Sequence, residues 1–134
     1  MKKTMCLMTV VAFGLCVAAQ AEDKVDFVKQ IKPIFEASCV KCHNPEKHKN
    51  DLRFDNKKDA LKGGKHGACI VPGKAAESDV VKRISLPPDD DDVMPSKGAH
   101  LTKEQIKLVT DWINQGAEWP DGVALEDKSP KDKK

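Results

Sequence analysis

The amino-acid sequence predicts a small all-α protein whose helices are joined by long loops. Residues 24–42 and 102–116 carry apolar side chains at helical spacing. The sequence shows no internal repeat and no segment that is typical of a strand of useful length. Glycine and proline interrupt much of the remaining sequence, which favours irregular connections.

The first helix is expected over residues 24–42. Pro33 lies inside this segment, and because proline has no backbone N–H it should either kink the helix or mark a fresh start near Lys32. The apolar stripe of the segment consists of Phe27, Ile31, Ile34 and Phe35.

The middle of the chain is predicted to be mostly irregular. Residues 44–50 are polar and should form an exposed loop, and residues 59–61 should form a short turn. Closely spaced glycines between residues 63 and 73 indicate a further loop, and they lack the GxxxxGK[ST] order of a phosphate-binding loop. A short helix is expected over residues 78–84, where Ser78 can cap the first turn.

The clearest helix is predicted over residues 102–116. Thr102 and Gln105 form a capping box at its start, and Gly116 stands where a C-terminal cap is wanted. Residues 126–134 lie beyond this helix and are rich in charge, so we expect them to form a disordered tail.

The N-terminus has the pattern of an export signal. Residues 1–3 include two lysines, residues 5–18 are almost wholly apolar, and Ala19-Gln20-Ala21 is a typical cleavage site. The apolar run is short for a membrane span. We therefore expect residues 1–21 to be removed, which leaves a mature chain without a stable membrane span.

Charge and length restrict what the mature chain can be. Loss of Lys2 and Lys3 with the signal takes the formal net charge from +2 to zero, which argues against nucleic acid as a partner. The remaining length of about 110 residues suits one small domain, which we assign to residues 22–125. The apolar content of this domain is modest, so a large apolar cofactor would help to complete its core.

The most informative segment is Cys39-Val40-Lys41-Cys42-His43. Cys-x-x-Cys-His is the attachment signature of c-type haem, in which each thiol adds to one vinyl group of the porphyrin. On helical turns, Cys39, Cys42 and His43 would lie at i, i+3 and i+4 on one face, along which a flat haem could lie. We therefore predict one covalent haem c, attached through Cys39 and Cys42, with His43 as an iron ligand.

Two other chemistries use similar motifs. A zinc site would need four ligands that converge on one small ion, whereas Cys42 and His43 are neighbours that diverge on a helix. A thioredoxin-like dithiol would need a strand–helix–strand setting, which is not evident in this sequence. Haem is the favoured interpretation. Attachment of this kind takes place outside the bacterial inner membrane, so we expect a periplasmic or otherwise exported bacterial protein.

The second iron ligand is sought among methionine and histidine. Met94 is the one methionine left after removal of the signal, and it precedes Pro95 in an irregular segment. Methionine is the usual sixth ligand where a high potential is needed. His66 and His100 are the alternatives, and bis-histidine ligation would lower the potential.

Charged residues precede Met94 in the sequence. Residues 89–92 are four consecutive aspartates, which we interpret first as a solvated loop and second as an acidic patch that steers a basic redox partner. Calcium binding ranks last, because the run lacks the ligand pattern of an EF-hand. Arg83 is the candidate partner of a haem propionate, since its guanidinium group matches a carboxylate, and a surface arginine is an equally good interpretation.

The chain resembles the planctomycete-type cytochrome c domain over nearly the whole mature sequence. The resemblance begins with Phe-Val-Lys-Gln-Ile-Lys-Pro-Ile-Phe-Glu-Ala-Ser-Cys-Val-Lys-Cys-His at residues 27–43. The further motifs, in chain order, are Leu52-Arg53-Phe54-Asp55, Gly63-Gly64, Ile70-Val71-Pro72-Gly73-Lys74, Glu77-Ser78, Lys82-Arg83-Ile84, Met94-Pro95, Leu101-Thr102 and Trp112-Ile113-Asn114-Gln115-Gly116-Ala117-Glu118-Trp119-Pro120.

This resemblance implies a class I-like cytochrome c fold, in which N- and C-terminal helices pack together around one haem. It also implies that Cys39 and Cys42 are the covalent anchors, His43 the proximal ligand and Met94 the distal ligand. Such domains often precede large partner domains. Here the chain ends soon after its last helix, so we expect its redox partners, the electron donor and acceptor, to be separate proteins.

The function expected from these features is one-electron transfer without enzymatic activity. One alternative is a haem enzyme or gas sensor with an open sixth position. Another is a dedicated electron-transfer subunit of a periplasmic dehydrogenase. Cys69, the remaining cysteine of the mature chain, is expected to be a small buried residue.

Overall fold

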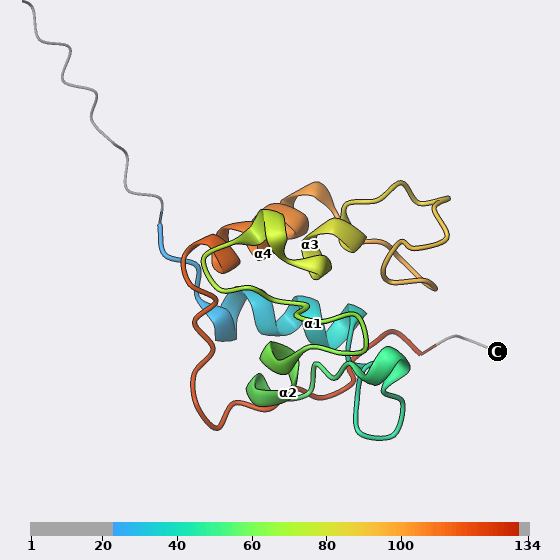
Figure 1. Cartoon of the computed structure of the whole chain (residues 1–134), viewed down its shortest axis with the longest axis horizontal. Coiled ribbons are helices and arrows are strands. Elements are labelled where there is room, and N and C mark those ends of the chain that lie inside the picture. The colour runs from blue at the N-terminus through green and yellow to red at the C-terminus, as the bar shows by residue number, and fades with distance from the viewer. Residues whose placement is uncertain (1–22, 132–134) are drawn as a thin grey trace, which may run out of the picture.

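The computed structural model describes residues 23–131 (Figure 1). The predicted signal, residues 1–21, lies outside the described residues. In chain order the elements are the π-helical turn η1 (Phe27–Ile31), helix α1 (Lys32–Ser38), the 3₁₀ turn η2 (Lys49–Asp51), helix α2 (Lys57–Lys62), the 3₁₀ turn η3 (Ala75–Glu77), helix α3 (Asp79–Ile84) and helix α4 (Lys103–Asn114).

Helices, turns and loops make up the described structure, and residues 23–131 contain no strand. The all-α prediction is confirmed at this level. The short turn expected at residues 59–61 is part of a longer helix, α2. Over the same range, no helix is both long and apolar enough to cross a membrane.

Helix α1 lies in the middle of the molecule (Figure 1). Helices α3 and α4 lie on one side of it, and α2 lies on the other. The segment that follows α4 passes around the start of η1 and returns on the α2 side. The loop between α3 and α4 projects beyond the helices, at the end where α1 stops.

The break between η1 and α1 is set by Pro33. Asp26 caps η1 by accepting a hydrogen bond from the backbone N–H of Lys29 at 2.9 Å. At the far end of η1, the N–H of Lys32 reaches back five residues to the carbonyl of Phe27, and a new α-helix then starts with Pro33 in its first turn. Proline is tolerated there because the first N–H groups of a helix have no partner within it. The predicted fresh start near Lys32 is confirmed.

Helix α4 begins and ends as its sequence predicts. Thr102 and Gln105 exchange both hydrogen bonds of the capping box. At the other end, Gly116 adopts a φ of 107° and its N–H donates to Ile113, while the N–H of Ala117 donates to Trp112. These two bonds form a Schellman motif, which requires a left-handed residue and therefore favours glycine.

Aromatic side chains join the N-terminal helical segment to α4. Phe27 stacks on Trp119 with the ring centroids 4.3 Å apart and contacts Trp112 at 5.4 Å. Phe35 meets Trp112 edge-on at 5.7 Å. Both indoles are buried, and their N–H groups donate to the carbonyls of Glu118 and Val123. The two ends of the domain thus share one core, whose aromatic contacts each add to simple burial.

Helix α3 forms where it was predicted, but Ser78 does not cap it. The Ser78 side chain is fully buried and makes no capping bond to α3. Its hydroxyl instead accepts the N–H of Val71 at 2.9 Å and donates to the carbonyl of Lys74 at 2.9 Å. A buried hydroxyl needs hydrogen-bond partners within the protein, and the backbone of the turn at residues 71–74 supplies them for Ser78.

Glu36 ties the C-terminal segment to α1. Its carboxylate is almost fully buried and accepts hydrogen bonds from the ammonium groups of Lys32 and Lys128 and from the backbone N–H of Glu126. The N–H of Lys128 also donates to the carbonyl of Glu36 at 3.0 Å. The predicted disordered tail over residues 126–134 therefore needs correction, because residues 126–128 are bound to α1.

These contacts determine the charge of Glu36. Burial acts to raise its pKa, but the hydrogen bonds from Lys128, Lys32 and Glu126 outweigh burial and lower the pKa from 4.5 to about 2. Because the pKa in the folded protein lies below the ordinary value, the ionised carboxylate stabilises the fold fully above pH 4.5. This stabilisation is lost as the pH falls towards 2.

We predict that Glu36→Gln lowers the free energy of unfolding at neutral pH by about 3 kcal/mol, which is the shift in pKa expressed as energy. The difference between the variant and the wild type should shrink as the pH falls through the range between the two pKa values. Urea denaturation at a series of pH values measures both effects. Glu46→Gln, at an exposed glutamate, is the matched control. A loss of stability that is the same at every pH would contradict the prediction.

Candidate functional site

The Cys-x-x-Cys-His motif lies on a tight turn that continues α1. The N–H of Cys39 donates to the carbonyl of Phe35 at 2.8 Å, which ends the helix. The carbonyl of Cys39 then accepts the N–H of Cys42 at 3.2 Å and that of His43 at 3.1 Å. Helix-like bonds from i to i+3 and i+4 therefore span the motif, which is the backbone arrangement that its spacing requires.

The cysteines of the described chain are free thiols. Cys39 packs against the hydrophobic core, and Cys69 lies within it. Burial, together with the neighbouring thiols of Cys69 and Cys42, raises the pKa of Cys39 to about 12. Burial likewise raises the pKa of Cys69 to about 12. Cys69 is thus the buried residue that was predicted, and it lies near the motif.

His43 is held by its backbone and by its ring. The Nδ1 atom lies 3.2 Å from the carbonyl oxygen of Leu52, and because a carbonyl only accepts, Nδ1 carries the proton. The ring meets Phe54 edge-on at 5.9 Å, and the N–H of Phe54 donates to the carbonyl of His43 at 2.8 Å. This arrangement leaves the lone pair of the neutral ring on Nε2, the nitrogen that can bind a metal.

The protonation state of His43 also suits a metal ligand. Burial lowers its pKa below the ordinary value of 6.5, against the opposing effect of the hydrogen bond to the carbonyl of Leu52. The imidazole is therefore neutral at neutral pH, which is the form that coordinates a metal. The sequence motif identified His43, but it contained no sign of the Leu52 carbonyl that orients the ring.

Gly64 supports the segment that carries the Leu52 carbonyl. A Cβ atom at Gly64 would lie 2.4 Å from the carbonyl oxygen of Asn50 and 3.0 Å from the Cβ of Leu52. The N–H of Lys65 donates to the same Asn50 oxygen at 2.7 Å. Glycine is needed at this point because two backbone segments approach each other closely. The sequence predicts only a loop at Gly64. The Gly63-Gly64 pair was the one feature that could have indicated a close approach of two backbone segments.

Met94 lies on the loop that connects α3 to α4. Its side chain is partly buried and packs against the hydrophobic core, and its N–H donates to the carbonyl of Arg83 at 3.1 Å. His66 and His100, the alternative ligands, are both exposed. Of the three candidates, Met94 is therefore the one already placed against the interior.

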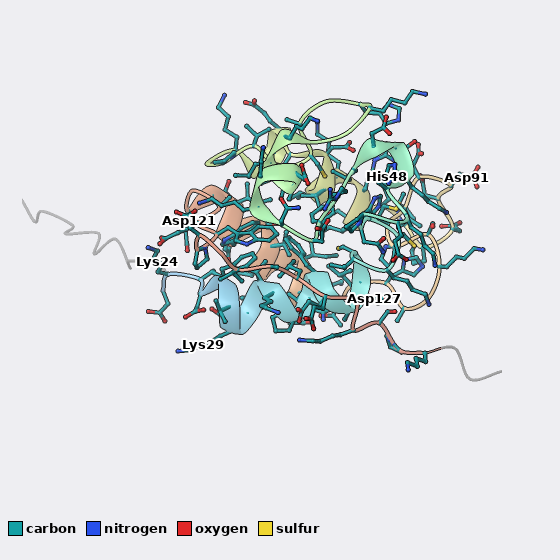
Figure 2. All side chains as sticks on the ribbon, turned by 90° about the horizontal axis from the view of Figure 1, so that it is seen from below. Lys24, Lys29, His48, Asp91, Asp121 and Asp127 are labelled. Atoms are coloured by element: carbon teal, nitrogen blue, oxygen red, sulfur yellow. The ribbon has the colours of Figure 1, made fainter. Side chains whose placement is uncertain are left out.

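The loops that carry His43 and Met94 lie at the same end of the molecule. Figure 1 shows them at the end where α1 stops, with the Met94 loop on the α3 side and the His43 loop on the α2 side. Figure 2 gives the same result from another direction, because His48 and Asp91, one from each loop, are both labelled far from Lys24.

Arg83 is already paired with acidic side chains. Its Nε donates to Asp79 at 2.7 Å, and its Nη1 donates to the carboxylate of Asp92 at 3.2 Å. The contact with a haem propionate stays a prediction. The four-aspartate run is also more than a solvated loop, because Asp92 is bound to Arg83 and the Asp90 carboxylate accepts the N–H of Asp92 at 2.9 Å.

These residues fit a covalently attached haem. Two free thiols stand on one turn, followed by a neutral imidazole whose Nδ1 is already engaged, and the loop that carries Met94 lies at the same end of the domain. Thioether and imidazole form a ligand pair typical of cytochromes c. Within residues 23–131, no group of three or more Cys, His, Asp or Glu side chains is placed to hold a metal ion.

Comparison with known proteins gives one match. Residues 39–98 match the family model described as planctomycete cytochrome C. The match starts at the first cysteine of the motif and extends past Met94, and it confirms the resemblance seen in the sequence over that segment. A match to a cytochrome c domain suggests a haem protein that transfers electrons. No curated protein and no solved structure gives a significant match.

We predict that Gly64→Ala disturbs the support of His43. The added methyl group must displace residues 50–52, and overpacking of this kind costs about 1–3 kcal/mol. Chemical denaturation measures the loss of stability, and the haem content of the purified protein measures the effect on the site. Lys65→Ala, at the exposed neighbour in the same loop, is the control. Equal stability and equal haem content in the two variants would refute the close-approach argument.

Proposed function

We propose that this chain, whose residues 39–98 match planctomycete cytochrome c, is an exported one-electron carrier with one covalent haem c. The observation that carries the proposal is the turn after α1. Two free thiols and a neutral imidazole follow one another there, and the imidazole is oriented by the Leu52 carbonyl. Cys39 and Cys42 attach the haem, His43 is the proximal ligand and Met94 is the distal ligand.

Haem, when bound, supplies a one-electron couple that needs no proton-transfer group from the protein. The chain's own residues supply attachment and orientation. The Nδ1–H of His43 donates to Leu52 and keeps Nε2 available, and the edge contact with Phe54 restricts rotation of the ring. When Nδ1 of a ligating histidine donates a hydrogen bond, Nε2 becomes more basic and binds a metal more strongly.

The support of His43 suits an electron carrier because it extends into the rigid core. Phe54 meets Phe35 edge-on at 5.1 Å, and Phe35 contacts Trp112 of α4. A ligand held in this way changes position little when the charge of its metal changes. On the other side, the partly buried thioether of Met94 would keep the sixth position closed, which favours electron transfer over ligand binding or enzymatic reaction.

Export is part of the same proposal. The predicted signal over residues 1–21 would bring the chain to the compartment where c-type haem is attached, and the chain would meet its redox partner proteins there by diffusion. The mass of the purified protein tests this point, because a mature chain that starts at Glu22 and carries one haem has a defined mass. A chain that keeps residues 1–21 would contradict cleavage.

We predict that His43→Ala abolishes proper haem incorporation, whereas Met94→Ala keeps the haem and opens the sixth position. Absorption spectra after acid–acetone extraction show whether the haem is covalent. The far-red band of the oxidised protein reports sulfur ligation, and carbon monoxide binding to the reduced protein reports an open position. His66→Ala and His100→Ala are the controls and should behave as wild type.

Two results would overturn parts of this proposal. If carbon monoxide binds to the wild type as readily as to Met94→Ala, the electron-carrier assignment is wrong and the chain is a haem protein with an open sixth position. Loss of the wild-type spectrum in His66→Ala or His100→Ala, with Met94→Ala unchanged, would assign the sixth ligand to histidine. If acid–acetone extracts the haem from the wild type, the haem is not covalently attached.

A further inference from the structure

The segment of residues 92–94, in the loop between α3 and α4, is bound to Arg83 at the end of α3. Three hydrogen bonds join residues 92–94 to Arg83 in the described structure. The backbone carbonyl of Arg83 accepts the N–H of Met94 at 3.1 Å. Its guanidinium Nη1 donates to the carboxylate of Asp92 at 3.2 Å and to the carbonyl of Asp92 at 3.4 Å. One residue thus binds both Met94 and the position two residues before it.

The side chain of Arg83 is itself held in place by contacts within α3. It lies in the last turn of α3, and its side chain is only 26% exposed. The guanidinium is also bound by Asp79, one helical turn earlier, to which its Nε donates at 2.7 Å. Helix α3 itself is fastened by buried Val80 and Ile84, and the N–H of Val80 donates to Cys69.

The aspartate run is shaped to reach Arg83. The Asp90 carboxylate accepts the N–H of Asp92, and the Asp90 carbonyl accepts the N–H of Val93 at 3.2 Å. These bonds fold the segment into a turn that directs Asp92 towards α3 and buries Val93. Asp91 lies between them, is exposed, and forms no side-chain hydrogen bond within residues 23–131 (Figure 2).

We propose that Arg83 and Asp92 are positioning residues for the distal ligand. Their contact, together with the backbone bond between Arg83 and Met94, orders the loop so that the thioether is presented to the sixth position of the haem. The proposal rests on the proposed function, in which Met94 is that ligand. The physical reason is entropy: a loop that is already held loses less conformational freedom when its side chain binds.

A different role for Arg83, contact with a haem propionate, makes a different prediction. In that case the effect of losing the guanidinium would not depend on Asp92. If Arg83 positions the Met94 loop, removal of either partner has the same consequence, and removal of both adds little. Coupling between Arg83 and Asp92 therefore separates the two roles.

The experiment compares the haem-loaded wild type with Arg83→Gln, Asp92→Asn, the double variant and Asp91→Asn. Asp91→Asn is the matched control, because it removes the same charge one residue away. We measure the affinity of carbon monoxide for the reduced protein, with which Met94 competes. Arg83→Gln, Asp92→Asn and the double variant should each bind it about fivefold more tightly, since a partly exposed ion pair contributes a modest energy. Asp91→Asn should match the wild type.

Amide hydrogen exchange of Met94 provides a second readout that does not depend on added ligand. Exchange should be faster in Arg83→Gln and Asp92→Asn and unchanged in Asp91→Asn, because the Met94 N–H bond opens more often when the loop is released. Asp92 is 76% exposed, so Asp92→Asn tests the proposal even if Arg83→Gln does not fold.

The outcomes distinguish this inference from the function on which it rests. A wild type without the far-red band overturns Met94 ligation and the positioning role with it. A wild type with the band, in which Asp92→Asn behaves as Asp91→Asn in both assays, overturns the positioning role alone and leaves the carrier in place. The positioning role is also overturned if the changes in carbon monoxide affinity caused by Arg83→Gln and Asp92→Asn add together in the double variant.

Discussion

The packing of Phe35 against α4 determines where the motif lies. Phe35 contacts Trp112 and Trp119 on one side and Phe54 on the other, with centroid distances between 5.1 and 6.3 Å. Phe54 in turn contacts the His43 ring. The end of α1 is therefore fixed relative to α4 and to the loop that orients the histidine. If this aromatic cluster were lost, the turn from Cys39 onward would have no defined direction.

Main-chain groups, rather than side chains alone, hold the candidate haem ligands. Leu52 orients His43 through its carbonyl, and the Arg83 carbonyl binds the N–H of Met94. Loops can be positioned accurately in this way because each backbone group is fixed by the segment on both sides of it. Gly64 serves the same purpose, since its missing side chain lets residues 50–52 approach.

A buried and an exposed carboxylate bind different segments of this domain. Glu36 is withdrawn from water and neutralised by two lysines, so it fastens the C-terminal segment to α1. Asp92 stays largely in water and pairs with an arginine that is itself held by Asp79. The first arrangement joins the C-terminal segment to α1, whereas the second joins the loop that carries Met94 to α3.

The sequence by itself determined the features that depend on near neighbours. The helix at residues 103–114 with its capping box, the restart at Pro33 and the turn of the Cys-x-x-Cys-His motif all follow from residues a few positions apart, so the local pattern was sufficient. Only the tertiary structure decided which distant groups meet. The Leu52 carbonyl at His43, the bonds from residues 126–128 to Glu36 and the pairing of Arg83 with Asp92 leave no periodic signal in a sequence. Ser78 shows the reason most clearly. Its position predicted a helix cap, but its side chain is buried and its hydroxyl bonds to the backbone of the preceding turn instead. Burial is a property of the folded chain and leaves no sign in the neighbouring residues.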